Sequence, residues 1–575
     1  MPTLQFKGKN IIWNHHLSVP YHTLEEVEEL HFQPEKGNGN LIIEGDNLIA
    51  LKALLPEYAG KVKCIFIDPP YNTGNDVDEG IGWKYSDKVN SPMINEWIDK
   101  EVSRDDLTKH DKWLCMIIPR LKLLKELLHE NGAVFITIDD NEYASLKTIM
   151  DEIFNEENFV ANVVWQARKS VQNDTDLSVN HNYVLIYARN RRQTDRRLKE
   201  SNANLWYKMS GFVLKPLLLD KTKFSNPDND SRGLWKADPF DAPNVRENLT
   251  YPIINPHTGK EYWPPKGRHW RTEQKNYLKL LDEKRIIFGK NGKSGPQLKV
   301  FWDDKKEYGE VETSWWGDGS YDSYIENDID VEDAINWTNY GTTTNGSKLL
   351  QLLFDSEKVF NNPKPIELLK HIISQSTNKD DIILDSFAGS GTTMHAVNEL
   401  NKIDGGKRKC ILVQMREDSE NEPDKNICKD ITRERNKRAI EKYNYESGFK
   451  YLRIGTPIDP EKLLEGVLPT YEQFAKYIYY LGTGEHLAEA KNINSSSHFV
   501  GNHGIKAFFL IYEQDVDALS RLALSLHIAE EIINQSPNKR RVIYAPACFL
   551  DSEYMEEKQI EFVSIPYNLF ERKIN

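Results

Sequence analysis

The chain of 575 residues has few cysteines, and their spacing suits neither cross-linking nor metal binding. They are odd in number and never form a Cys-x-x-Cys pair, lying at Cys64, Cys115, Cys410, Cys428 and Cys548. This usage argues against both a disulfide framework and a zinc site, and it fits a reducing cytoplasm.

Long apolar segments are also missing. No stretch approaches the roughly 20 apolar residues that span a bilayer, and residues 1–13 carry neither an apolar signal core nor a small-residue cleavage site. We therefore expect a soluble cytoplasmic protein with no membrane partner and no bound metal.

An excess of positive charge, the usual sign of nucleic-acid binding, is absent, since the formal net charge is −14. Total charge is a poor guide in a long chain, however, because a local basic face is enough to bind phosphates. From Arg189 to Lys299, basic residues outnumber acidic ones about two to one, whereas the segment from Asp303 to Asp333 is strongly acidic. The net charge therefore does not argue against nucleic-acid binding by the basic segment.

Short apolar segments alternate with helical patterns in the first 190 residues, which indicates an α/β fold with a parallel sheet. One long amphipathic helix is expected at 113–131, ended by Gly132. The other expected elements are strands at 41–43, 63–67, 133–138 and 183–188, and helices at 47–55 and 142–154.

The alternation stops between about residues 190 and 345, where Pro, Gly, Asn, Trp and basic residues are frequent. We expect an irregular insertion held together by aromatic contacts. The α/β pattern then returns, with expected helices at 365–374 and 392–400 and strands at 382–384 and 410–413. A last unit after Gly455 has expected strands at 507–512 and 541–544, with a helix at 515–533 between them.

Asp68-Pro69-Pro70-Tyr71 directly follows the expected strand 63–67, so it lies at the carboxyl end of a strand, where ligands bind in open α/β sheets. An aromatic amine is a poor nucleophile because its lone pair is conjugated with the ring. A carboxylate and a backbone carbonyl that accept its two N–H bonds localise that lone pair. The prolines stiffen the loop, and Tyr71 offers a face on which an extruded base can stack. A turn with an exposed acid would be the simpler interpretation of an isolated Asp-Pro-Pro.

A second loop, Asp385-Ser-Phe-Ala-Gly-Ser-Gly-Thr-Thr393, follows the expected strand 382–384 and opens a helix. Its glycines allow close approach of a ligand to the backbone, and a helix start favours negative charge. The loop lacks the Lys of a phosphate-binding P-loop, and its spacing is not that of the dinucleotide fingerprint. A helix-capping turn is the alternative interpretation if this loop is taken alone.

Taken together, the two loops resemble the β group of amino-methylating DNA methyltransferases, in which the Asp-Pro-Pro-Tyr block precedes the Phe-x-Gly-x-Gly block. The resemblance is particularly to the modification (Mod) subunits of type III restriction-modification systems. It is carried by residues 68–76 and by Phe387 to Thr393 followed by His395-Ala-Val397. It covers residues 40–455 well and the C-terminal unit less distinctly.

The resemblance implies S-adenosyl-L-methionine as cofactor and a Rossmann-like α/β methyltransferase core with circularly permuted motif order. Asp68, Pro69, Pro70 and Tyr71 would be catalytic. The cofactor-binding residues would be Asp46, Asn47, Lys364, Pro365, Asp385, Phe387, Ala388, Gly389, Ser390, Gly391, Thr392 and Gln414.

One position departs from the common pattern of these enzymes. Many relatives end the strand after the glycine loop with Glu, but this chain has Gln414, with Glu417 three residues later. The resemblance leaves open which of the two contacts the donor's ribose.

The implied domains are an N-terminal extension (1–40), the catalytic half of the core (41–190), a target-recognition domain (191–345), the cofactor half (346–455) and a C-terminal assembly domain (456–575). Arg268, Trp270 and Arg271 are candidate DNA-binding residues because Arg can contact phosphates and Trp can stack on bases. A small aromatic core with a solvated charged face is the alternative for this segment.

The function implied is methylation of N6 of adenine in double-stranded DNA after base flipping, by a homodimer that docks a restriction (Res) subunit. Family usage favours adenine for an Asp at the first loop position, but N4 of cytosine stays open because the chemistry is nearly identical. A solitary methylase is a further alternative. A non-catalytic DNA-binding specificity subunit is the last, although the intact loops argue against it.

Overall fold

The structure is a computed structural model of the whole chain, and it forms two compact units. Unit 1 comprises Met1–Arg196, Met209–Leu214 and Thr313–Asn575, and unit 2 comprises Arg197–Lys208 and Lys215–Glu312. Residues 74–76, at the end of the segment 68–76 that carries the resemblance, and much of the acidic segment from Asp303 to Asp333 lie outside the described residues. The described residues are 3–37, 39–73, 109–171, 176–191, 211–215, 221, 224–289, 291–305, 311–317, 340–417, 426–458, 463, 468–488 and 493–565.

Unit 1 is built on a mixed sheet to which the described residues contribute ten strands. The run from β17 to β4 is parallel throughout, and β6 is antiparallel to both of its neighbours. The order is β1 (Tyr21–Glu26), β17 (Lys450–Ile458), β2 (Leu41–Glu44), β16 (Lys409–Gln414), β15 (Ile382–Asp385), β3 (Val62–Ile67), β4 (Leu128–Ile138), β6 (His181–Ala188), β5 (Phe159–Gln166) and β14 (Trp315–Trp316). The predicted α/β class with a mostly parallel sheet is confirmed.

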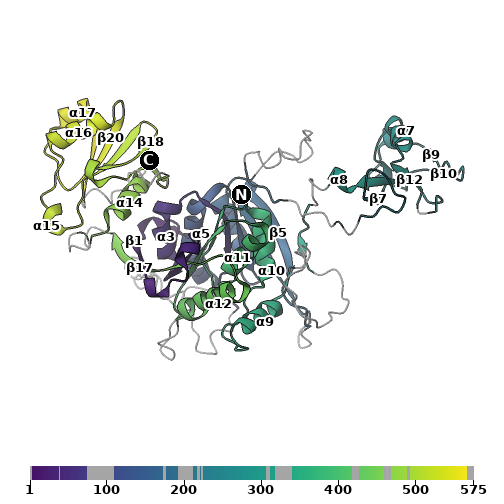
Figure 1. Cartoon of the computed structure of the whole chain (residues 1–575), viewed down its shortest axis with the longest axis horizontal. Coiled ribbons are helices and arrows are strands. Elements are labelled where there is room, and N and C mark those ends of the chain that lie inside the picture. Colours follow the sequence, from purple (N-terminus) through teal and green to yellow (C-terminus); the bar gives the residue numbers. More distant parts are fainter. Residues whose placement is uncertain are drawn as a thin grey trace. The chain divides into compact units, whose positions relative to one another are not determined.

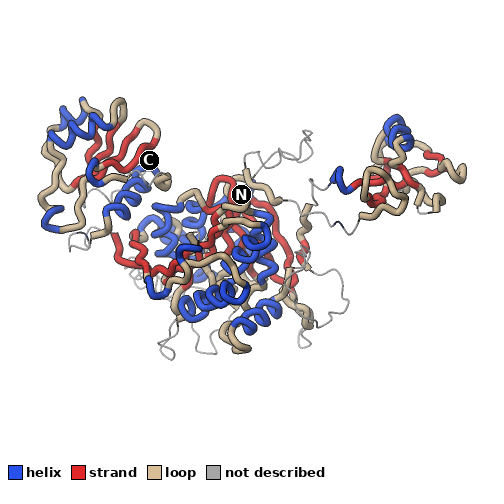
Figure 2. The backbone as a smooth tube through the Cα atoms, viewed as in Figure 1, coloured by secondary structure: helices blue, strands red, loops and turns tan. Residues whose placement is uncertain are grey.

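Helices pack against the strands of this sheet (Figure 2). Alternate side chains of β3 enter two separate cores, as the strand period of two requires. Ile65 and Ile67 belong to the core of α3 (Asn47–Tyr58), α5 (Lys109–Leu127) and α6 (Tyr143–Phe154). Cys64 and Phe66 belong to the core of α10 (Ile366–Ser376), α11 (Thr392–Asp404) and α12 (Glu434–Tyr443). The catalytic strand is therefore buried on both faces, which explains its continuous apolar sequence.

The carboxyl ends of β2, β16, β15, β3 and β4 lie at one edge of the sheet because these strands are parallel. β3 and β15 are direct neighbours, although 314 residues lie between Ile67 and Ile382 in the sequence. The two loops singled out in the sequence therefore start side by side.

The helix expected at 113–131 ends earlier than predicted. α5 ends at Leu127, and β4 begins at Leu128, which pairs with Val62 of β3. Pairing with a buried strand prevails here over the helical periodicity of the sequence. Gly132 does not stop a helix. It allows a close approach inside the sheet, since a Cβ at this position would lie 2.9 Å from the Lys63 carbonyl oxygen.

The helix expected at 515–533 is divided into α15 (Val516–Leu519) and α16 (Leu526–Gln535). Leu524 lies between them and donates its backbone N–H to Ala547, 2.8 Å away, in a bridge that the helical pattern does not reveal. This C-terminal part has the sheet β18 (Phe499–His503), β19 (Lys506–Leu510), β20 (Arg540–Ala545) and β21 (Ile560–Ser564), and Figure 1 labels it in yellow-green.

The C-terminal part contacts the core of unit 1 through α14 (Tyr471–Thr483) and the residues after it. The Tyr480 hydroxyl donates to Glu126, and His486 Nδ1 donates to the Ala59 carbonyl 2.7 Å away. Within the described ranges, no helix combines the length and apolar character needed to span a bilayer.

The described residues of unit 2 form short strands and short helical segments, of which α7 (Gln274–Asp282), in teal in Figure 1, is the longest. β7 (Trp235–Pro239), β13 (Gln297–Phe301) and β12 (Ile286–Ile287) form a small sheet, and β8 (Asp241–Pro243) pairs with β11 (Arg268–Trp270). Its buried core includes Phe240, Tyr251, Trp270, Tyr277 and Phe288. The aromatic contacts expected from the composition are thus present, while the functional domain boundaries stay a prediction.

Candidate active site

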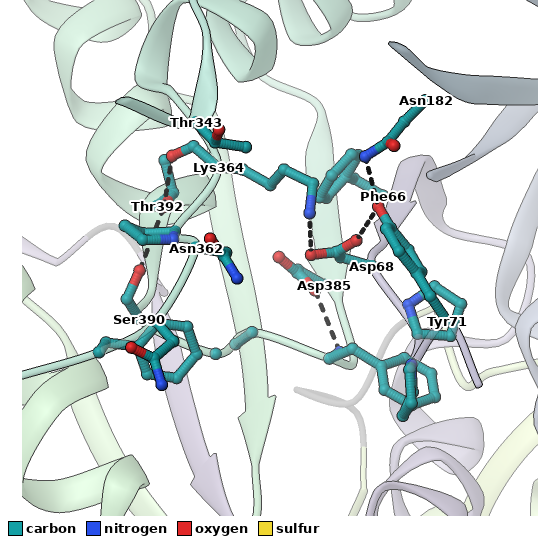
Figure 3. Close-up of a pocket in the computed structure, with 18 of the residues that line it drawn as sticks. Phe66, Asp68, Tyr71, Asn182, Thr343, Asn362, Lys364, Asp385, Ser390 and Thr392 are labelled. Atoms are coloured by element: carbon teal, nitrogen blue, oxygen red, sulfur yellow. Dashed lines mark hydrogen bonds and ion pairs between the residues drawn. The ribbon is translucent and has the colours of Figure 1, made fainter. Parts of the chain in front are cut away.

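The Asp68 loop leaves β3 at Asp68, whose carboxylate is held by three side chains, of which Figure 3 shows Tyr71 and Lys364. Thr137 donates to Oδ1 over 2.6 Å, and the Tyr71 hydroxyl donates to the same oxygen over 2.9 Å. Lys364 forms an ion pair with Oδ2. The side chain of Asp68 is nevertheless 26% exposed, so it is oriented but still reachable.

Tyr71 is fixed at its hydroxyl and contacted on the face of its ring. Its hydroxyl accepts a hydrogen bond from Asn182 as well as donating to Asp68, and Lys364 Nζ lies 5.3 Å from the ring centroid. Burial, with the nearby Asp68 charge, raises the pKa of Tyr71 well above its ordinary value, so the hydroxyl stays protonated as a donor. Trp113 of α5 donates to the Pro70 carbonyl over 2.7 Å and holds the loop from behind.

The Pro69 carbonyl differs from its neighbour. Within the described part of the chain, no hydrogen-bond donor is recorded for it, whereas the Pro70 carbonyl has Trp113. Asp68 and Pro69 thus supply a carboxylate and a carbonyl at the same strand end, the pair that the sequence predicted for an amino group.

Lys364 connects the two loops. Its side chain pairs with Asp68, and its backbone carbonyl accepts a hydrogen bond from Thr392 at the start of α11 (Figure 3). The sequence predicted a donor-side role for Lys364. The structure places its ammonium on the catalytic carboxylate and only its backbone beside the glycine loop.

The glycine loop leaves β15 at Asp385, which is almost fully buried. Its carboxylate accepts from the Phe387 N–H over 3.1 Å and from the Thr393 hydroxyl. Burial raises the pKa of Asp385 to about 7, with the Asp68 charge acting in the same direction. Among the described Lys and Arg residues none forms an ion pair with Asp385, so the site presents an acid without a cation.

Gly389 and Gly391 are needed for their backbone conformation, with φ of 51° and 79°, and for space. A Cβ on Gly389 would meet the Phe360 ring at 3.0 Å, and a Cβ on Gly391 would meet Asn436 Nδ2 at 2.5 Å. Gly391 therefore packs the loop against α12 and does not line the cavity, so its predicted contact with the cofactor stays a prediction.

Gln414 and Glu417 act as a pair at the end of β16. Gln414 Oε1 accepts from the Gly389 N–H over 2.7 Å, and Gln414 Nε2 donates to Glu417 Oε1 over 2.7 Å. The amide therefore bridges the glycine loop and the acid three residues later.

Asp46 and Asn47 lie behind the glycine loop. Asn47 donates to the Ser386 carbonyl over 2.9 Å, and the buried Arg120 bonds both Asn47 and Asp46. Asp46 also caps α3 by accepting from the Leu48 N–H. This hydrogen-bond network therefore holds the glycine loop in position.

These loops enclose one cavity of about 400 Å³. Of the predicted catalytic and cofactor residues, all line it except Asp46, Asn47, Pro365 and Gly391. Sequence reasoning missed several lining residues. Asp139 follows β4 at the same sheet edge, so the strand-end rule that found Asp68 could have found it; Asn182 and Thr343 carried no such signal. The missed residues are Phe66, Thr73, Asp139, Ala167, Arg168, Asn182, Thr343, Phe360, Asn361, Asn362, Pro363 and Thr393; Glu417, which the sequence offered as the alternative to Gln414, lines the cavity as well.

The three candidate DNA-binding residues lie in unit 2. Arg268 and Arg271 are partly exposed and form ion pairs with Asp241 and Asp238. Trp270 is only 3% exposed and donates its indole N–H to the Tyr251 carbonyl. Its ring is therefore part of the aromatic core and presents no free face, so DNA contact here stays a prediction that rests on the two arginines.

Residues 62–421 match the family described as DNA methylase. The chain belongs to the DNA methylase family. The match includes both loops in the permuted order, with the catalytic strand β3 before the cofactor strand β15 in sequence and beside it in space.

Three curated members of this family show how the similarity is distributed. The StyLTI Mod subunit of a type III restriction-modification enzyme from Salmonella typhimurium is 34% identical over 75% of this chain and 63% of its own length. The EcoP15I Mod subunit from Escherichia coli is 31% identical over 76% and 69%. The type II methyltransferase M.KpnI from Klebsiella pneumoniae is 30% identical over 68% and 84%. The chain thus spans about two thirds of the Mod subunits and more of the type II enzyme.

Proposed function

We propose that this DNA methylase transfers a methyl group from S-adenosyl-L-methionine to N6 of adenine in double-stranded DNA, as the Mod subunit of a type III restriction-modification system. One observation carries the proposal. The Asp68-Pro-Pro-Tyr71 loop and the glycine loop, far apart in sequence, line a single cavity of about 400 Å³ at the ends of adjacent strands.

The catalytic loop suits an amino group. The Asp68 carboxylate and the Pro69 carbonyl accept the two N–H bonds of the amine, which localises its lone pair for attack. Thr137 and Tyr71 keep the Asp68 carboxylate in one orientation. Because their bonds exist before the substrate arrives, little reorganisation is needed at the moment of reaction.

The glycine loop suits a donor with an amino acid end. Asp385 is a buried acid without an ion-pair partner in the described residues, and the donor's ammonium would supply one. When bound, S-adenosylmethionine supplies an electrophilic methyl on a sulfonium. Glu417, held by Gln414, would accept from the ribose hydroxyls; the hydrogen bond between the two supports this choice.

The target base must leave the helix to reach this cavity, because N6 of a paired adenine lies inside the duplex. The Tyr71 ring, fixed by Asp68 and Asn182, offers a stacking face for the extruded base. Unit 2 is the proposed target-recognition domain, with Arg268 and Arg271 as phosphate contacts.

The proposed assembly is a homodimer that docks a Res subunit through the C-terminal part. The similarity to two Mod subunits supports this assembly. A cytoplasmic location is proposed as well, because all five cysteines are free thiols, as in a reducing compartment.

Two alternatives within the methylases have support of their own. N4 of cytosine presents the same kind of amine to the same two acceptors. A solitary methylase that acts without a Res subunit is favoured by the match to 84% of the type II enzyme M.KpnI.

The test is a methyl-transfer assay on duplex DNA with labelled S-adenosylmethionine, followed by mass spectrometry of the nucleosides. We expect N6-methyladenine. N4-methylcytosine alone would reassign the base. Neither donor binding nor transfer to any bacterial DNA would favour a non-catalytic specificity subunit.

A further inference from the structure

Arg435 is a buried charge directly behind the glycine loop. It lies at the start of α12 and is 0% exposed. Its Nη1 donates to the hydroxyl oxygens of Ser390 over 2.7 Å and of Thr392 over 2.6 Å. Both hydroxyl residues line the cavity, so Arg435 is separated from it by a single layer of side chains.

The charge of Arg435 is not compensated by an acid. Among the described residues no carboxylate forms an ion pair with it, and its Nε and Nη2 atoms have no hydrogen-bond partner. Burial lowers the pKa of Arg435 to about 9, and only the more distant Tyr443 and Glu367 favour the charged form.

Two other buried arginines of unit 1 have acidic partners, whereas Arg541 donates its hydrogen bonds to neutral oxygens of Ser536 and Lys558. Arg120 pairs with Asp46, and Arg408 pairs with Asp404. An unpaired buried cation is costly. A ligand that brings an anion to the neighbouring cavity would compensate Arg435 and offset that cost.

The hydroxyls between Arg435 and the cavity can carry this interaction. The Thr392 hydroxyl donates its hydrogen bond to the Lys364 carbonyl. Among the described residues, the nearest acceptor for the Ser390 hydroxyl is the Thr392 hydroxyl, 3.4 Å away. A hydroxyl that accepts from a guanidinium becomes a stronger donor. Ser390 also precedes α11, whose positive end favours an anion at the same place.

A charge of the opposite sign lies at the other end of the glycine loop, at Asp385. In the part of the chain that the structure describes, Asp385 is a buried acid that forms no ion pair, and Ser390 is backed by a buried cation that forms none. An α-amino acid carries both missing charges on one carbon. Lys364 is the competing cation in this cavity, but its ammonium is already paired with Asp68.

We propose that Arg435 is a positioning residue that supplies positive charge for the α-carboxylate of S-adenosylmethionine, acting through the Ser390 hydroxyl. This inference rests on the proposed function, because it assumes that donor. It assigns a role to α12, which the two sequence loops do not include.

The experiment compares two donors that differ only in the α-carboxylate: S-adenosylmethionine and its decarboxylated analogue. Their affinities for the full-length protein and for Arg435→Met are measured by calorimetry. We expect the substitution to weaken the binding of S-adenosylmethionine by roughly tenfold or more, the effect of losing a hydrogen bond to a charged group. Binding of the decarboxylated analogue should not change.

Arg408→Met is the matched control, since Arg408 is also buried but has its own acid and does not line the cavity. It should lower the melting temperature without discriminating between the donors. If Arg435→Met does not fold, Ser390→Ala replaces it and should show the same selective loss.

Equal weakening of both donors by Arg435→Met or by Ser390→Ala would mean a merely structural role and would overturn the inference. If the wild-type protein binds neither donor, the proposed function itself fails, and the inference with it.

Discussion

Two loops leave adjacent strands at the same edge of the sheet, yet they treat their acids in opposite ways. Asp68, at the end of β3, is 26% exposed and is held by Thr137, Tyr71 and Lys364. Asp385, at the end of β15, is 2% exposed, and within the described ranges its hydrogen bonds come from the neutral Phe387 N–H and Thr393 hydroxyl.

The difference shows how one sheet edge can serve both reactants. A compensated acid is held in one orientation and can act as an acceptor for an incoming amine. An uncompensated buried acid has a raised pKa, about 7 for Asp385, and gains most from a cationic ligand. Because β3 and β15 are neighbours, both acids line the same cavity, where the proposed amine and cationic donor would meet.

Asp68→Ala should distinguish the roles of the two loops most clearly. It removes the acceptor for the amine and leaves the donor side intact, so we expect kcat to fall by roughly 100-fold or more. Donor affinity should change little. Turnover by a single-turnover assay and affinity by calorimetry check both halves, and unchanged turnover would remove the proposed mechanism.

Gly391→Asp should displace the glycine loop from its position against α12. A Cβ there would meet Asn436 Nδ2 at 2.5 Å and the Thr432 carbonyl at 3.0 Å, so the loop must shift. We expect donor binding to be lost and about 1–3 kcal/mol of stability with it, as for other overpacked sites.

Gly405→Asp is the matched control for that substitution. Gly405 has a similar φ of 66°, but a Cβ on it meets nothing within 4 Å. It should therefore keep donor binding, measured by calorimetry. Equal loss in both variants would show that backbone strain is responsible and not packing against α12.

The pH dependence of donor binding should report Asp385. Its ionised form predominates above pH 7 and is lost below, so the attraction for the donor's ammonium declines in acid. We expect the affinity to fall by roughly tenfold for each pH unit well below 7. Calorimetry from pH 5.5 to 7.5 measures this, with 5′-methylthioadenosine, which has no ammonium, as the control. The same slope for both ligands would contradict the assignment.

Tyr71→Phe should have the smallest effect. It removes the hydroxyl that donates to Asp68 but keeps the ring and the bonds from Thr137 and Lys364. We expect kcat to fall roughly 2- to 10-fold, with donor affinity unchanged. A loss as large as that of Asp68→Ala would mean that the hydroxyl takes part in the reaction itself.

The strands that carry the site were predictable because each is a short apolar run ended by a polar loop. β3 and β15 follow this rule, and so do the positions of Asp68 and Asp385. α5 was predicted too long, since the sequence does not record that Leu128 pairs with Val62. Trp270 was predicted at a DNA surface because composition does not distinguish a buried aromatic ring from an exposed one.

The sequence by itself determined the two loops, their order and the α/β class, because these depend on local residue types and on periodicity. Only the tertiary structure decided which groups meet. It placed the Lys364 ammonium on Asp68, tied Gln414 to the Gly389 N–H, and brought Arg435 behind Ser390. These contacts join segments that are far apart in the sequence and that only the fold brings together, so no local pattern could reveal them.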